Sequence, residues 1–135
     1  MSRLFNPQKE RESASPGKTT FTIPGQPVPK VRMTQKSKWS DRARASLSYQ
    51  EYVAWCAKAA KIPKYTGDVM LTVKVCLGGR GRADLKNVIA AVEDGLQYGG
   101  VVENDKQILR YGTGTGFHLG FKAPKVIVEI EEMQG

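Results

Sequence analysis

The sequence predicts a single-domain α/β (α+β) fold in which a small mixed β-sheet packs against two helices, in the order β-α-β-α-β-β. The chain has 135 residues, which is enough for one domain with one core. Hydrophobic residues make up 40% of it, which excludes a disordered chain. Apolar residues recur at every second position in some segments and at helical spacing in others, and these two periods distinguish strands from helices.

Three segments show the alternation that is typical of half-buried strands. Residues 19–25 alternate until a Pro-Gly pair ends the run, and residues 125–131 alternate near the end of the chain. The clearest strand is 68–77. Its inner face carries Val69, Leu71, Val73, Val75 and Leu77. A further short strand is expected at 108–112, and the Gly-rich stretch 112–120 is expected to be mobile.

Two helices are expected between these strands. Ser40 or Asp41 can cap a helix that runs to about Lys61. Asp84 can cap a second helix over residues 85–97. The buried stripe of this second helix is Leu85, Val88, Ile89, Val92 and Leu96. Residues 1–17 are polar and show no period, so they are expected to form a flexible tail ahead of a domain over 18–135.

The chain is basic, and its cations are clustered. Lys and Arg total 21 against 13 Asp and Glu, for a net charge of +8. The first cluster surrounds Trp39 and consists of Lys30, Arg32, Lys36, Lys38, Arg42 and Arg44. Arg80 and Arg82 form a second group. Cations interleaved with an aromatic ring favour a nucleic acid as partner, although a run of charges is usually only a solvated face.

Several other classes of protein are disfavoured. No stretch of 18 apolar residues is present, so no membrane span is expected, and the polar N-terminus predicts no secretory signal. Cys56, Cys76 and His118 match no zinc-site spacing. We interpret both cysteines as reduced core thiols of a cytoplasmic protein.

Acidic residues stand at both ends of the second predicted helix. Asp84 precedes it, and Glu103, Asn104 and Asp105 follow it. A helix of about 13 residues is roughly 20 Å long, so the chain must fold back before Asp105 can approach Asp84. Carboxylates among cations suit a metal-dependent nuclease, because a divalent ion polarises the phosphoryl oxygen and generates hydroxide. The alternative is that Asp84 is only a helix cap and residues 103–107 only a polar turn.

Three segments resemble the RusA family of Holliday-junction resolvases, which are metal-dependent endonucleases. Residues 21–33, FTIPGQPVPKVRM, resemble the opening strand and basic Pro-containing loop of the family. Residues 82–96, RADLKNVIAAVEDGL, resemble its Asp-Leu-Asp-Asn helix start and a later Asp-x-Leu. Residues 101–108, VVENDKQI, resemble its apolar pair followed by Asp-Asp and Gln-Ile or Gln-Val. The likeness covers about residues 18–132.

The resemblance implies a homodimer that cuts branched DNA, in particular four-way junctions, with Mg²⁺ or Mn²⁺. By position, Asp84 and Asp105 match aspartates that hold the metal ion, and Asn87 matches the asparagine of the helix start. Two positions depart from the family pattern. Lys86 stands where a second metal-binding aspartate belongs, and Ala90 stands where the catalytic lysine belongs.

These departures leave three possibilities open. In the first, Lys86 supplies the missing positive charge from one helical turn earlier, and Asp94, Glu103 or Asn104 completes the metal shell. In the second, the site no longer cuts and the protein only binds junctions. In the third, the substitution was introduced to inactivate a normal enzyme.

The activity that we expect is that of a structure-selective endodeoxyribonuclease, which resolves four-way junctions by paired symmetric nicks. Its expected catalytic residues are Asp84, Asp105 and Lys86. Its expected DNA-binding residues are Lys30, Arg32, Lys36, Lys38, Arg80 and Arg82. The alternative is a non-catalytic protein of the same fold that binds branched DNA.

Overall fold

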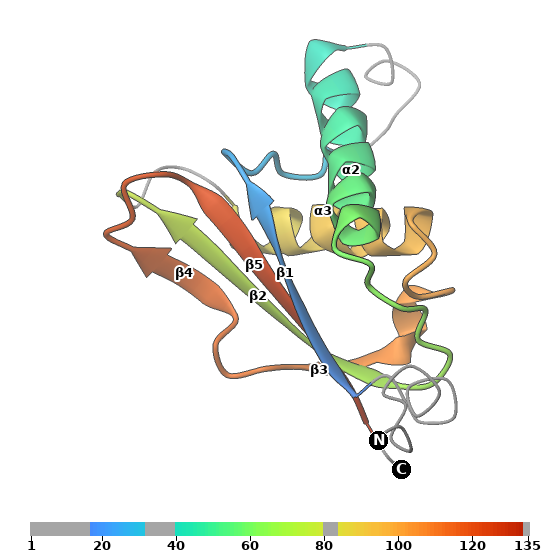
Figure 1. The fold of residues 1–135 in the computed structure, drawn as a ribbon. Coiled ribbons are helices and arrows are strands. Elements are labelled where there is room, and N and C mark those ends of the chain that lie inside the picture. Colours follow the sequence, from blue (N-terminus) through green and yellow to red (C-terminus); the bar gives the residue numbers. More distant parts are fainter. Residues whose placement is uncertain (1–16, 32–39, 80–83, 134–135) are drawn as a thin grey trace, which may run out of the picture.

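A computed structural model describes residues 17–31, 40–79 and 84–133, and it confirms the predicted class and order of elements (Figure 1). The first half of the chain forms strand β1 (Lys18–Pro24), helix α2 (Asp41–Ala59) and strand β2 (Val69–Leu77). The second half forms helix α3 (Leu85–Tyr98), the 3₁₀ helix η2 (Asp105–Gln107), and strands β3 (Ile108–Tyr111), β4 (Gly116–Leu119) and β5 (Lys125–Glu132). The described residues therefore form one small α+β domain.

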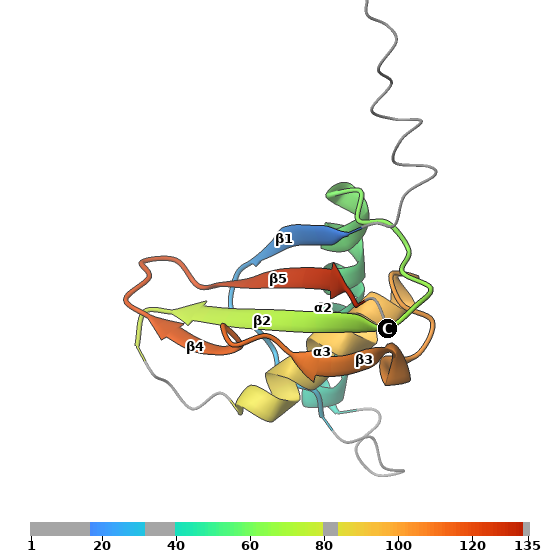
Figure 2. The same cartoon turned by 90° about the horizontal axis from the view of Figure 1, so that it is seen from below.

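The five strands form one mixed sheet, in the order β1-β5-β2-β3, with β4 also paired to β2. Strand β5 runs antiparallel to both of its neighbours, β1 and β2. Strands β3 and β4 both run parallel to β2, and Figure 2 shows them one after the other along the same edge of it. A parallel pair needs a crossover connection, and the segment containing α3 supplies it between β2 and β3.

Both helices cover the same face of the sheet, and the core lies between the two layers (Figures 1 and 2). The inner face of β2 is the one that its alternation predicts, and all five of its apolar side chains are buried. Helix α3 faces them with its predicted stripe, of which three members are fully buried: Val88, Val92 and Leu96. Burial of this apolar surface is the main driving force that places α3, and hence both of its ends, against the sheet.

Helices α2 and α3 cross closely at a glycine. A Cβ atom added to Gly95 would lie 2.5 Å from the Cβ atom of Val53. No real Cβ atom tolerates such a distance, so the close crossing requires glycine at this position of α3. The crossing fixes α2 across α3, and so places the first turns of both helices relative to each other.

The structure departs from the sequence expectations in the Gly-rich stretch 112–120, which contains strand β4. The backbone of this stretch pairs with β2, and the hydroxyl of Thr115 accepts a hydrogen bond from the backbone N–H of Val73 at 3.2 Å. Its order therefore comes from a partner strand that is distant in sequence. Gly17, expected at the end of the tail, accepts a hydrogen bond from the N–H of Glu132 at 2.9 Å. Residues 1–16 lie outside the described part of the chain.

Two further expectations concern the cysteines and the membrane. Cys56 and Cys76 are both buried and both free of disulfide bonds, as predicted. Among the described residues, no helix has the length and apolar character that crossing a membrane requires.

Candidate active site

Asp84 is the N-cap of α3, as its place before the apolar stripe predicts. Its Oδ1 atom accepts hydrogen bonds from the backbone N–H groups of Lys86 at 3.0 Å and Asn87 at 3.4 Å. Its Oδ2 atom accepts one from the side-chain amide of Asn87 at 3.0 Å. A carboxylate offers about four lone-pair sites, so these three bonds leave about one, on Oδ2, for a further partner.

A hollow of about 340 Å³ opens beside this carboxylate. Its walls come from three segments: the connector between β1 and α2, the first turns of α2, and the start of α3. The lining residues are Val28, Pro29, Lys30, Val31, Arg42, Ala45, Asp84 and Asn87. Two cations, Lys30 and Arg42, thus line the same hollow as Asp84, the aspartate that the sequence predicts as a metal ligand.

The connector is held against both helices by three bonds. The backbone N–H of Lys30 donates to the carbonyl of Asn87 at 2.9 Å. The backbone N–H of Val31 donates to the hydroxyl of the buried Ser46 at 3.2 Å. The ammonium group of Lys30 forms an ion pair with Asp94 at 2.8 Å. Asp94 therefore binds a lysine, and this pairing competes with the predicted role of Asp94 in a metal shell.

Lys86 is exposed in the first turn of α3. Its contact with Asp84 is the hydrogen bond from its backbone N–H group, and not an ion pair of its ammonium group. Within the described ranges, its ammonium group forms no ion pair. An ion pair between Lys86 and Asp84 is thus not formed here, and the ammonium group remains available to a ligand.

Asp105 opens η2, in a turn that is tied down by Gln107. The side-chain oxygen of Gln107 accepts hydrogen bonds from the backbone N–H groups of Glu103 at 2.7 Å and Asn104 at 3.2 Å. Its amide nitrogen donates to the carbonyls of Tyr65 and Gly67, each at 2.8 Å. Gln107 therefore fixes the turn of Asp105 against the loop before β2.

The other polar side chains of this turn have local partners. Asn104 caps η2, with its Oδ1 atom accepting from the N–H of Lys106 at 2.8 Å. Glu103 pairs with Lys64 at 2.8 Å, and the hydrogen bond and charge of Lys64 lower the pKa of the Glu103 carboxyl group. Both residues were candidates for the metal shell, and here both stabilise the turn.

Asp105 belongs to a second acidic group, with Glu93 of α3 and Tyr111 of β3. The hydroxyl of Tyr111 donates a hydrogen bond to Oε2 of Glu93. Burial raises the pKa of Glu93, and the negative charges of Asp105 and Asp94 raise it further. The hydrogen bond from Tyr111 acts in the opposite direction and lowers this pKa. Burial, the bond to Glu93 and the neighbouring carboxylates raise the pKa of Tyr111 to about 12. Glu93 and Tyr111 carry no local signal in the sequence, since they meet only because the tertiary fold brings Tyr111 of β3 to Glu93 of α3.

The two predicted metal-binding aspartates have different neighbours. Glu93, beside Asp105, lies nine residues after Asp84, which is about 13 Å along the helix axis. None of the hydrogen bonds and ion pairs within the described residues joins Asp84 to Asp105. In the same part of the chain, no three or more His, Cys, Asp or Glu side chains form a group that could hold a metal ion.

The departures from the family pattern lie on one face of α3. Lys86, Ala90 and Glu93 are spaced by four and three residues, which places them on the same side of the helix. Asp105 interacts with Glu93, at the far end of this face. An aspartate at position 86 would therefore face the same side as the group around Asp105.

Five of the predicted DNA-binding residues cannot be placed. Arg32, Lys36, Lys38, Arg80 and Arg82 lie outside the described residues. Lys30 is described, and it lines the hollow beside Asp84.

The capping aspartate Asp84 thus lies beside a hollow lined by the cations Lys30 and Arg42, an arrangement that suits contact with a phosphate group. The model of the family described as Endodeoxyribonuclease RusA matches residues 24–131 of the chain. That span is most of the sequence, and the chain therefore belongs to the RusA endodeoxyribonuclease family. A search of curated proteins found no match. Membership implies an endonuclease that resolves Holliday junctions.

Proposed function

We propose that this protein is a metal-dependent, structure-selective endodeoxyribonuclease of the cytoplasm, which acts as a homodimer and resolves four-way junctions by paired symmetric nicks. Family membership supports the reaction class. The observation that carries the proposal to particular residues is the position of Asp84, whose carboxylate lines a hollow together with Lys30 and Arg42.

The donor set at Asp84 fits one divalent ion through a single carboxylate. Mg²⁺ is commonly held by one or two carboxylates and keeps several of its waters. The remaining lone-pair site on Oδ2 of Asp84 suits such binding. When bound, Mg²⁺ or Mn²⁺ would polarise the phosphoryl oxygen and supply hydroxide at neutral pH. The family resemblance assigns Asp105 to the same ion, and this assignment stays a prediction.

The residues of the chain would share the remaining work. Asn87 orients the carboxylate of Asp84 through its hydrogen bond to Oδ2. Lys86, exposed in the same turn, would neutralise the negative charge that develops on the phosphate. A four-way junction has approximate twofold symmetry, and a twofold-symmetric dimer presents two identical sites, which fits paired nicks in opposing strands.

A second function has a specific observation in its favour. Lys86 replaces an expected carboxylate by a cation, and the described residues contain no group of three acids that could hold an ion. A positive charge two residues from Asp84 weakens the binding of a divalent cation. The alternative is therefore a protein that binds junctions without cutting them.

The proposal is tested with a labelled synthetic four-way junction, with and without Mg²⁺. We expect paired symmetric nicks that need the metal and are lost in Asp84→Asn. Asparagine is also a good N-cap, so this variant keeps the start of α3. Tight junction binding with no nicking at any Mg²⁺ or Mn²⁺ concentration would establish the binding protein instead.

A further inference from the structure

Arg42 is a cation without a partner in the described part of the chain. It lies in the first turn of α2, is exposed, and lines the hollow beside Asp84. Neither a hydrogen bond nor an ion pair engages its guanidinium group within residues 17–31, 40–79 and 84–133. Lys30, the other cation of the hollow, is by contrast paired with Asp94. The hollow thus contains one unpaired positive group.

The position of Arg42 is not explained by the stability of its helix. The first turn of a helix carries a partial positive charge, so a cation there is electrostatically unfavourable. Its side chain is exposed, so it contributes no buried contact to the core. A ligand of negative charge would give it a favourable partner.

The chemistry of the hollow specifies the kind of anion. A guanidinium group donates several hydrogen bonds from a planar fork that matches two oxygens of a phosphate. Helices α2 and α3 both begin at the hollow, and their N-terminal ends favour negative charge. The bonds from Lys30 and Val31 hold the wall of the hollow in place.

We propose that Arg42 binds, in this hollow, the DNA phosphate that is cut. The proposal rests on the proposed function and adds to it a positioning group for the phosphate beside Asp84. Arg42 approaches from α2 and Asp84 from α3, so the close crossing of the two helices at Gly95 sets the relative position of the two side chains.

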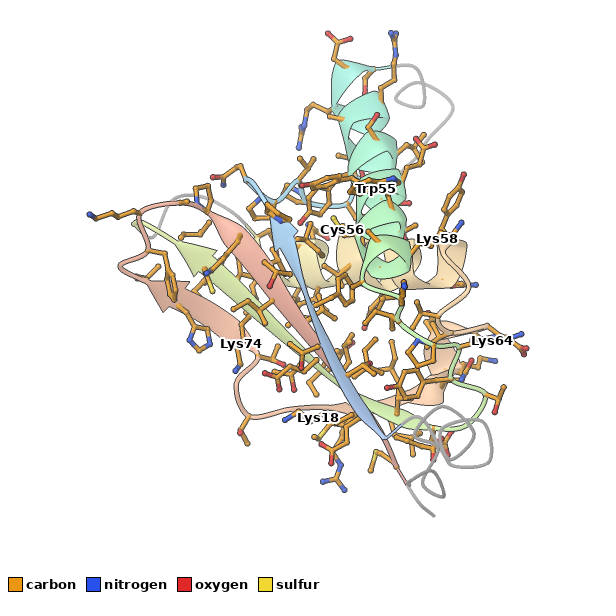
Figure 3. The ribbon with its side chains drawn as sticks, in the orientation of Figure 1. Lys18, Trp55, Cys56, Lys58, Lys64 and Lys74 are labelled. Carbon is orange, nitrogen blue, oxygen red and sulfur yellow. The ribbon has the colours of Figure 1, made fainter. Side chains whose placement is uncertain are left out.

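The first test compares Arg42→Ala with Lys58→Ala. Both substitutions remove one positive charge from an exposed position on α2, but Lys58 lies in the last turn, about 24 Å further along the axis (Figure 3). We expect Arg42→Ala to slow single-turnover cleavage of a junction by about 10- to 100-fold, as the loss of a charged hydrogen bond does. Lys58→Ala should change the rate by less than about twofold, and Arg42→Lys should recover part of the loss. Equal rates for Arg42→Ala and Lys58→Ala would overturn the proposal.

The second test needs no cleavage and no metal. A neutral methylphosphonate is placed in turn at each phosphate near the branch point, and binding is followed by fluorescence anisotropy in EDTA. We expect one position, the cut phosphate, at which neutralisation weakens binding to the wild-type protein but not to Arg42→Ala. The absence of any such position would overturn the proposal. If the wild-type protein does not cut, the proposed function fails, while this binding test still decides whether Arg42 holds a phosphate.

Discussion

The side-chain amide of Asn87 donates a hydrogen bond to Oδ2 of Asp84 at 3.0 Å. Asp84 in turn accepts hydrogen bonds from backbone N–H groups in the first turn of α3. The carboxylate therefore caps the helix, and the helix orients the carboxylate. A local sequence signal, a capping aspartate three residues before an asparagine, thereby fixes the direction of the oxygen that we assign to the metal ion.

Asn87→Ala should weaken metal binding more than it weakens the fold. Loss of a group that orients a metal ligand typically lowers affinity by about 10- to 100-fold. The capping bonds of Asp84 to the backbone remain, so we expect a small change in unfolding free energy. The measurements are Mn²⁺ affinity by titration calorimetry and stability by chemical denaturation.

The matched control for Asn87→Ala is Ser40→Ala. Ser40 caps α2, with its hydroxyl accepting from the N–H of Ala43 at 3.1 Å, and its loss costs about 1 kcal/mol. Ser40→Ala should reduce stability and leave Mn²⁺ affinity unchanged. If both variants lose affinity equally, Asn87 acts only through the fold.

Lys86→Asp should raise metal affinity but slow nicking, because it removes the cation that we assign to the developing negative charge on the phosphate. The substitution changes the charge at position 86 from positive to negative and keeps the backbone N–H group that donates a hydrogen bond to Asp84. Lys86→Ala, which only removes the cation, should give a smaller gain in metal affinity and should also slow nicking. The measurements are Mn²⁺ affinity and the rate of junction nicking, and faster nicking by Lys86→Asp than by wild type would contradict the proposed role of Lys86 and show that it impairs the site.

Tyr111 should lose its proton only near pH 12, because it is partly buried and bonded to Glu93. Its titration is obtained from the tyrosinate absorbance of the wild type minus that of Tyr111→Phe. Glu93→Gln removes a negative charge and should shift the midpoint towards 10, the ordinary pKa of a tyrosine. The control is Glu51→Gln, at an exposed position of α2, and it should leave the Tyr111 midpoint unchanged.

The same shift has a consequence for stability. Between about pH 10 and 12 the unfolded chain has lost the Tyr111 proton and the folded protein retains it, so the folded state is progressively destabilised as the pH rises through this window. Tyr111→Phe should remove this component of the pH dependence. An unchanged alkaline slope in Tyr111→Phe would contradict the assignment.

Gly95→Ala should destabilise the protein by about 1–3 kcal/mol, although alanine is the better helix former. The added Cβ would lie 2.5 Å from that of Val53, so the two helices must separate. Gly67→Ala is the control, since its Cβ meets no atom within 4 Å. Chemical denaturation measures both, and a neutral Gly95→Ala would show that the crossing can relax.

The sequence predicts those parts of the structure that depend on local patterns. The alternation in β2 and the stripe of α3 are local, and Asp84 was predicted as a cap from its neighbours alone. Strand β4 was not predicted, because its order comes from pairing with β2, some forty residues earlier. The pairing of Lys30 with Asp94 and of Tyr111 with Glu93 likewise depends on tertiary packing.

The most direct test is the binding of Mn²⁺, followed by electron paramagnetic resonance, in wild type, Asp84→Asn and Asp105→Asn, with exposed Asp68→Asn as control. We predict one bound ion per chain that is lost in Asp84→Asn and kept in Asp68→Asn. Loss of the same ion in Asp105→Asn would show that both aspartates share it. Unchanged Mn²⁺ binding in Asp84→Asn would contradict the account, because Asp84 would then not be a ligand of the ion.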